Sequence, residues 1–189
     1  LDWTFDDYPE IADLLRKHSG KTAEELNAEL GLNQQSSEKE KIQNFGINAT
    51  PLHIAVFSED VKGIEILIDV WNEIYNIYPE WKLVIVGPKN KYSNKLEQKI
   101  ISKNIKNIKF IGPLYGNNKF KIFSESQLYV LPTFSENFGV TVAESLSVGT
   151  PVIVTKNAPW ELIEKYNAGF WIGEGKDNLK ASIIKFINL

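Results

Sequence analysis

Two glutamates, Glu136 and Glu144, are separated by seven residues in a stretch of the chain that could carry chemistry. On one helix, eight steps of about 1.5 Å place their Cα atoms roughly 12 Å apart, rotated about 80° beyond two full turns. Carboxyl pairs that act across one glycosidic bond lie roughly 5 to 9.5 Å apart. The two glutamates therefore predict separate contacts to an extended ligand, not an acid–base pair. Spacing alone is not diagnostic, because Glu65 and Glu73 repeat it.

The surrounding residues 127–155 predict a strand, a sharp turn, a helix and a second strand. The apolar runs 128–131 and 152–154 are typical of buried parallel strands, and Ser135 or Asn137 is expected to cap the helix between them. The expected core stripe of this helix is Val140, Ala143 and Leu146. Such a unit places a turn and a helix N-terminus at the carboxyl edge of a parallel sheet, where phosphate-bearing ligands bind.

Residues 50–189 alternate between strand and helix patterns throughout. Further strands are expected at 52–57, 81–86, 108–111 and 169–172, and further helices at 62–78, 94–103, 119–124, 159–166 and 179–189. This order predicts an α/β fold, a Rossmann-like doubly wound parallel sheet preceded by a short helical N-terminal segment.

Residues 1–49 have a different character and predict a helical hairpin followed by a polar linker. Two patterns in this segment suggest a function. The sequence SGKT at 19–22 matches the end of a phosphate-binding loop, but Leu15 stands where the first glycine is required and no strand precedes it. A helix-turn-helix would need residues 35–44 as its recognition helix, and these lack apolar anchors. A hairpin that packs on another surface is the favoured interpretation.

Composition excludes several function classes. The net charge of −3 and the pI near 5.5 give no electrostatic case for a nucleic-acid partner. There is no cysteine, and His18 and His53 lie far apart, so we expect no thiolate or histidine metal site. No apolar run approaches the roughly 20 residues of a transmembrane segment. The first residues are acidic and polar, unlike a secretory signal, so we expect a cytoplasmic protein.

The motifs PTFSENFG at 132–139 and AESLSVGTPVI at 143–153 resemble the signature of retaining GT-B glycosyltransferases of family 4, the glycosyl transferases group 1. The resemblance extends over roughly residues 62–189 and includes KGIEILIDVW, WKLVIVGP, IKFIGPLYG, TKNAPWELIE and AGFWIG. It implies that residues 50–189 are the C-terminal, donor-binding half of a GT-B fold. It further implies transfer of a sugar from a UDP- or GDP-sugar, with retention, and no metal or other cofactor.

The resemblance also implies roles for individual residues. Glu144 matches the glutamate that contacts the ribose hydroxyls, Glu136 the one beside the donor sugar, and Lys62 the lysine that neutralises the diphosphate. We assign Glu136 and Lys62 as catalytic. A fixed cation at Lys62 would lower the barrier as the leaving group gains charge. The remaining expected donor contacts are Asn137, Phe138, Gly139, Val140, Leu114, Tyr115 and Gly87.

In the family, a glycan, lipid-linked or small-molecule acceptor enters through a second, N-terminal domain. That domain is missing from this chain, so we expect the chain to be inactive alone. The full-length enzyme would be cytoplasmic or membrane-peripheral, with a role in polysaccharide biosynthesis.

One position departs from the family pattern. An arginine is expected at the end of the first strand, but Phe57 and Ser58 stand there and Arg16 is the only arginine. Two alternatives are kept: a nucleotide-sugar binding module without activity, which this departure favours, and a truncated or engineered fusion, which the change in composition near residue 45 favours. The missing G-x-G-x-x-G fingerprint argues against a dinucleotide dehydrogenase.

Overall fold

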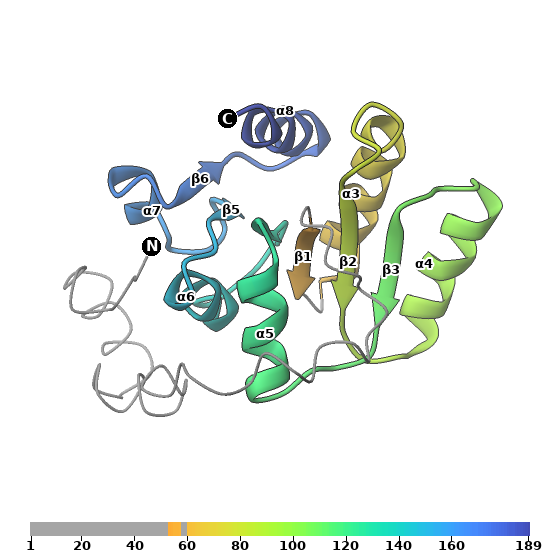
Figure 1. The fold of residues 1–189 in the computed structure, drawn as a ribbon, viewed down its shortest axis with the longest axis horizontal. Coiled ribbons are helices and arrows are strands. Elements are labelled where there is room, and N and C mark those ends of the chain that lie inside the picture. Colours follow the sequence, from red (N-terminus) through yellow and green to blue (C-terminus); the bar gives the residue numbers. More distant parts are fainter. Residues whose placement is uncertain (1–52, 58–59) are drawn as a thin grey trace.

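The computed structural model describes residues 53–57 and 60–189, which form a six-stranded sheet in the order β3-β2-β1-β4-β5-β6 (Figure 1). Every neighbouring pair of strands is parallel. The strands are β1 (His53–Phe57), β2 (Lys82–Val86), β3 (Ile108–Ile111), β4 (Leu128–Leu131), β5 (Val152–Thr155) and β6 (Gly169–Ile172). The predicted doubly wound sheet is confirmed. The predicted hairpin and linker at residues 1–49 lie outside the described residues.

Helices cover both faces of the sheet. One face packs against α3 (Val61–Ile74), α4 (Lys91–Ser102) and α8 (Lys176–Ile187). The other packs against α5 (Asn117–Glu125), α6 (Val140–Ser147) and α7 (Leu162–Lys165). None of the helices within the described ranges has the length and apolarity to cross a membrane.

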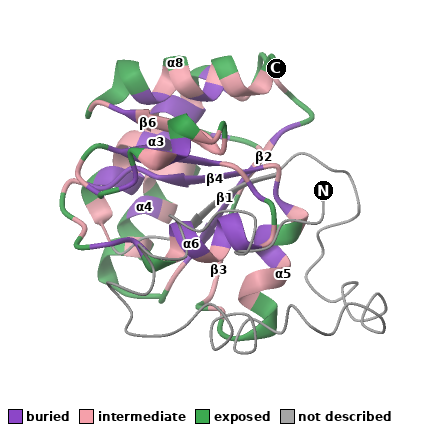
Figure 2. Cartoon of the chain, turned by 90° about the vertical axis from the view of Figure 1, so that its left-hand side faces the viewer, coloured by how far each residue is buried: buried purple, intermediate pink, exposed green. Residues whose placement is uncertain are grey.

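Strand β4 shows why its sequence is apolar without interruption. Leu128 and Val130 belong to the core under α3, whereas Tyr129 and Leu131 belong to the core under α6. Because successive strand residues point to opposite faces, a strand covered on both sides must be apolar at every position. Burial is accordingly concentrated along β4 and the inner side of α6, whereas α8 exposes much of its surface (Figure 2).

Helix α3 approaches the end of β4 closely enough to require a glycine. A Cβ atom at Gly63 would overlap the carbonyl oxygen of Pro132. The rest of the inward face of α3 is apolar at helical spacing and includes Leu67, Ile68 and Trp71, all fully buried. The start of α3 is thus held directly against the turn that follows β4.

Helix α6 begins later than its sequence suggested, and two predictions about it are wrong. Its N-cap is Gly139, with φ 78° and ψ 60° and no side-chain hydrogen bond, so neither Ser135 nor Asn137 caps it. Val140 is 56% exposed, and Val142 takes its place in the core beside Ala143 and Leu146. At 3.6 residues per turn, Val140 lies about 110° from the middle of that buried stripe.

Candidate functional site

The loop after β4 and the start of α3 meet at the carboxyl edge of the sheet. Strands β1 and β4 are neighbours there. From β1 the chain adds β2 and β3 on one side of the sheet, and from β4 it adds β5 and β6 on the other side. Such a topological switch point is where open α/β sheets bind ligands. Asp60 joins the two segments: its Oδ1 accepts the Gly63 N–H at 3.0 Å and its Oδ2 accepts the Phe134 N–H at 2.7 Å. We did not predict Asp60, although its place directly before α3 is typical of an N-cap.

Thr133 fixes the loop from the other side. Its buried hydroxyl donates to the Ser135 carbonyl at 3.0 Å, which shapes the turn. Its own carbonyl accepts from Thr155 Oγ1 at 2.5 Å and from Asn157 Nδ2 at 3.0 Å. The loop that carries Glu136 is therefore hydrogen-bonded both to Asp60 at the start of α3 and to Thr155 at the end of β5, and these bonds hold its backbone in place.

Lys62 contacts the loop that carries Glu136. The Lys62 Nζ atom lies 3.9 Å from the centroid of the Phe134 ring, in a cation–π contact, and its side chain is exposed. Glu136 is half-buried, and its Oε1 accepts the Phe138 N–H at 3.4 Å. Asn137 between them is exposed. The Lys62 ammonium and the Glu136 carboxylate thus lie at the same loop, beside Asp60, whose carboxylate accepts hydrogen bonds from the backbone.

Phe138 lies below the site. Its buried ring packs at 5.1 Å, centroid to centroid, against the fully buried Trp160, and the Trp160 Nε1–H donates to the Phe138 carbonyl. Both side chains belong to the core under α6. This packing supports the loop and leaves Phe138 only 7% exposed.

Gly139 is explained by its own backbone. Its φ of 78° is in the left-handed region that favours glycine. A Cβ atom there would lie 3.2 Å from Leu131 Cδ2 and 3.3 Å from Val142 Cγ2. The glycine is required by the turn and its packing, whether or not a ligand approaches. The exposed Val140 follows at the start of α6.

Glu144 forms an ion pair with Lys119 of α5, and the two side chains are only 17% and 20% exposed. The pair lies near the buried Tyr129 phenol, which shares a hydrogen bond of 2.7 Å with Thr141 Oγ1. Burial raises the pKa of Tyr129, and the negative charges of Glu144 and Glu136 raise it further. The charges of both carboxylates thus raise the pKa of the same phenol. We did not predict Lys119, because a lysine early in a helix has no distinguishing pattern.

The loop between β3 and α5 leads directly to Lys119. Leu114 packs against the core under α6, whereas Tyr115 is 78% exposed. Gly116 has a φ of 54° and precedes the first residue of α5. The loop that carries the expected donor contacts Leu114 and Tyr115 is therefore linked to the Lys119–Glu144 pair through a single turn of helix.

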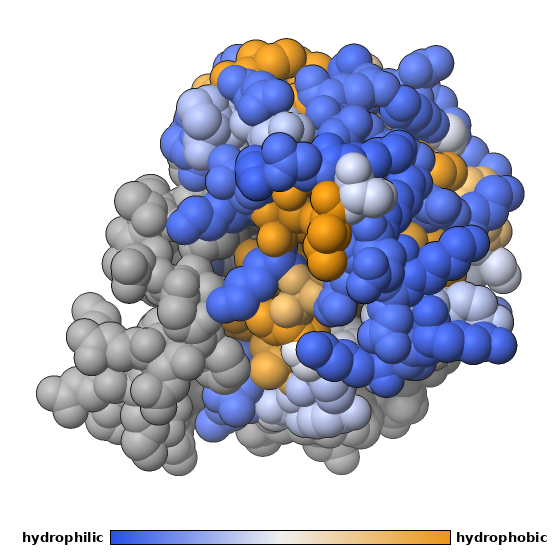
Figure 3. Space-filling view, turned by 90° about the vertical axis from the view of Figure 1, so that its right-hand side faces the viewer, coloured by the Kyte–Doolittle hydropathy of each residue, from blue (hydrophilic) through white to orange (hydrophobic). Residues whose placement is uncertain are grey.

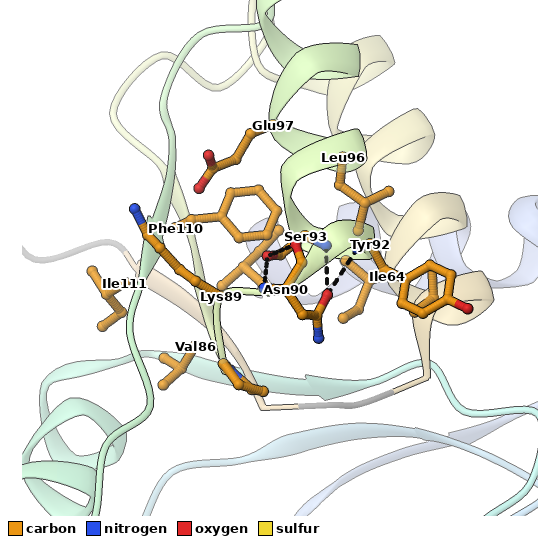
Figure 4. A pocket seen from close by; sticks show the side chains of 14 residues that line it. Ile64, Val86, Lys89, Asn90, Tyr92, Ser93, Leu96, Glu97, Phe110 and Ile111 are labelled. Atoms are coloured by element: carbon orange, nitrogen blue, oxygen red, sulfur yellow. Dashed lines mark hydrogen bonds between the residues drawn. The ribbon is translucent and has the colours of Figure 1, made fainter.

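Gly87 lines a cavity of about 310 Å³ at the carboxyl ends of β2 and β3, which also reaches Val61 and Ile64 at the start of α3. Apolar side chains gather in a hollow on the side that carries α4 and β3 (Figure 3). In the close-up, Asn90 and Ser93 are hydrogen-bonded to each other at the start of α4, beside the apolar walls of the cavity (Figure 4). The cavity is lined by Val61, Ile64, Ile85, Val86, Gly87, Pro88, Lys89, Asn90, Tyr92, Ser93, Leu96, Glu97, Phe110 and Ile111. The lining includes none of the other predicted donor contacts.

Within the part of the chain that the structure describes, no group of three or more His, Cys, Asp or Glu side chains is placed to hold a metal ion. The charged side chains at the switch point are Lys62, Asp60 and Glu136, and the Lys119–Glu144 pair lies along α5 and α6.

Comparison with curated proteins shows relatives that are glycosyltransferases. An uncharacterized glycosyltransferase of Methanocaldococcus jannaschii is 26% identical over 160 residues, which is 84% of this chain and 42% of that protein. A phosphatidyl-myo-inositol mannosyltransferase of Mycobacterium leprae is 22% identical over 77% of this chain and 39% of its own length. The chain thus spans about two fifths of these relatives.

Solved structures share the fold. The C-terminal domain of the glycosyl transferase group 1 family protein LpcC from Francisella tularensis has a TM-score of 0.64 and 22% identity, and the match covers 73% of this chain and 76% of that domain. The Anabaena protein Alr3699/HepE, solved with UDP and glucose, has a TM-score of 0.65 and 25% identity over 77% of this chain and 41% of its own. The profile of the family described as Glycosyl transferases group 1 matches residues 34–189. The chain belongs to this glycosyltransferase family.

Proposed function

We propose that the chain is the donor-binding part of a retaining glycosyltransferase of family 4. It binds a nucleotide-diphosphate sugar, and the enzyme transfers the sugar to an acceptor hydroxyl with retention. The observation that carries this proposal is the position of Lys62, whose Nζ atom lies 3.9 Å over Phe134 in the loop that also holds Glu136. A cation and a carboxylate at the switch point of the sheet suit a diphosphate and a sugar, respectively. The complex of the Anabaena relative with UDP and glucose supports this class of donor.

Each residue has a physical role in this proposal. The Lys62 ammonium stabilises the charge that the diphosphate gains as the glycosidic bond breaks. The first turn of α6, after Gly139, offers backbone N–H groups and a partial positive charge to a phosphate or sugar oxygen. Glu136 accepts hydrogen bonds from sugar hydroxyls, and Glu144 accepts them from the ribose. Tyr115, exposed at the end of the loop after β3, offers its ring to the base.

The acceptor belongs to a second domain in this proposal, since the relatives named above are more than twice as long as the matched segment. That domain would hold the acceptor hydroxyl against the anomeric carbon. The lysine and the helix N-terminus would neutralise the diphosphate, so the transfer is proposed to need no metal. Positioning of the acceptor can lower the activation barrier of the transfer by roughly 7 to 11 kcal/mol.

A second candidate function is a nucleotide-sugar binding module without turnover. Phe57 favours it, because this residue stands at the end of β1 where the family pattern has an arginine for the diphosphate. An apolar side chain cannot replace that charge. This candidate predicts binding of the same donors and no transfer, even when the second domain is present.

Calorimetric titration with UDP- and GDP-sugars, with and without EDTA, tests the proposal. Saturable binding that EDTA does not weaken is expected, and a full-length protein should then release UDP or GDP in the presence of simple glycoside acceptors. Binding without such turnover would favour the second candidate. No binding of any nucleotide sugar by the folded chain would overturn both.

A further inference from the structure

The Lys119–Glu144 ion pair joins two helices on the same face of the sheet. Lys119 comes from the first half of α5 and Glu144 from the middle of α6, and both side chains are largely buried. A carboxylate that is mostly removed from water needs a cation or several hydrogen bonds to stay ionised. Lys119 supplies that cation, so the position of the Glu144 carboxylate depends on α5.

Helix α5 is itself fixed. Thr150, which follows α6, donates from its hydroxyl to the Phe123 carbonyl at 2.6 Å, and the Phe123 ring packs edge-on against Tyr129 at 5.2 Å. Both contacts are buried. The backbone that carries Lys119 therefore cannot shift freely relative to α6, which keeps Lys119 within reach of Glu144.

We propose that Lys119 is a positioning residue for ribose recognition. It holds the Glu144 carboxylate in the orientation that accepts hydrogen bonds from the ribose hydroxyls of a ribonucleoside diphosphate. Because Lys119 lies one turn after the loop with Leu114 and Tyr115, it also fixes the distance between the ribose contact and the base contact. This inference rests on the proposed function, in which Glu144 meets the ribose.

Discrimination between ribose and deoxyribose tests Lys119 directly. The chain is titrated with UDP and GDP and with the 2′-deoxy and 3′-deoxy forms of each. Wild type should prefer the ribonucleotides by about tenfold or more, as expected for one charge-assisted hydrogen bond. Lys119→Gln should bring the ratio close to one, whereas Lys119→Arg should preserve it. Lys121→Gln, on the same helix, is the matched control and should leave the ratio unchanged.

The ratio separates a positioning role from a structural one. Partial unfolding weakens the binding of both nucleotides by the same factor and cancels from the ratio. If Lys119→Gln does not fold, Lys119→Met, which keeps the aliphatic stem, replaces it. A wild-type preference that persists in the folded variant would overturn the inference and leave the proposed function intact. Wild type that binds none of these nucleotides would overturn the proposed function itself.

Discussion

The Asp60 carboxylate accepts the Phe134 backbone N–H at 2.7 Å across the switch point of the sheet. Its second oxygen caps α3 through the Gly63 N–H at 3.0 Å. One side chain thus holds the helix that carries Lys62 against the loop that carries Glu136. The relative position of these two charged groups depends on Asp60, although Asp60 need not touch the ligand.

Asp60→Ala should destabilise the fold more than the loss of an ordinary helix cap. The cap is worth about 1 kcal/mol and the charge-assisted hydrogen bond to Phe134 about 1.5 to 3 kcal/mol, so the expected loss in the free energy of unfolding is about 2 to 4 kcal/mol. Urea unfolding followed by circular dichroism measures it. Asn90→Ala is the control, because Asn90 caps α4 through the Tyr92 and Ser93 N–H groups without a bridge to another loop. Equal losses in the two variants would contradict the bridging role.

Gly63→Ala should destabilise the fold by about 1 to 3 kcal/mol, because its Cβ atom would overlap the Pro132 carbonyl oxygen and force α3 away from β4. Thermal and urea unfolding would report the loss. Gly112→Ala is a matched control, since a Cβ atom there meets nothing within 4 Å and should change stability by less than about 0.5 kcal/mol. A neutral Gly63→Ala variant would show that the two elements can separate without loss.

The sheet could be predicted from sequence because its signals are local. The predicted bounds of the third and sixth strands, 108–111 and 169–172, agree with β3 and β6. Apolar runs between turn residues suffice for strands buried on both faces. The start of α6 could not be predicted in this way, because Ser135, Asn137 and Gly139 are all acceptable helix N-caps by residue type. The N-cap is Gly139, whose φ of 78° is in the left-handed region that favours glycine.

The site was predictable only where a motif marked it. Glu136 and Lys62 lie at the switch point and Glu144 lies along α6, as the motif order implies. Asp60 and Lys119 carry no motif. Their importance comes from contacts with residues 74 and 25 positions away, and such pairings depend on how the elements pack.

Asp69 should make stability fall at acid pH. Burial raises the pKa of Asp69, but the hydrogen bonds and charges of Lys99 and Lys103, at 2.8 and 3.1 Å, lower it more, so the pKa lies below its ordinary value of 3.8. The unfolded chain therefore binds a proton first, and the stabilisation is lost as the pH falls below about 4. Asp69→Asn should cost less than about 1 kcal/mol at pH 6 and almost nothing near pH 2.5. An equal difference at both pH values would contradict this.

Glu144→Gln should weaken nucleotide binding by about 1 to 3 kcal/mol, because the charge-assisted hydrogen bond to the ribose is lost. Calorimetry with UDP and GDP measures the change. Glu73→Gln is the control: Glu73 repeats the spacing from Glu65, but it pairs with Lys176 and Lys180 on α8. Unchanged affinity in a folded Glu144→Gln variant would rule out the ribose contact.

Lys62→Met should weaken the binding of UDP by about tenfold and leave the binding of uridine unchanged. The ammonium contributes only where a phosphate is present, and one hydrogen bond to a charged group is worth about 1.5 to 3 kcal/mol. Methionine keeps an apolar stem over Phe134, so the loop should keep its shape. The loss should shrink at high salt, because the exposed lysine is screened. Titration with UDP and uridine at two salt concentrations measures all three effects.

Lys91→Met provides a matched control for Lys62→Met. Lys91 is likewise exposed in the first turn of a helix, and its Nζ atom lies 4.9 Å from the centroid of the Tyr92 ring. It lies at the start of α4, next to the cavity that contains Gly87, and the lining of this cavity includes no residue of the loop with Glu136. Replacing it should leave the affinity for UDP unchanged. If both variants lose the same affinity, Lys62 acts through the overall charge of the chain. If Lys62→Met weakens uridine as much as UDP, the diphosphate lies elsewhere and the proposed orientation of the donor is wrong.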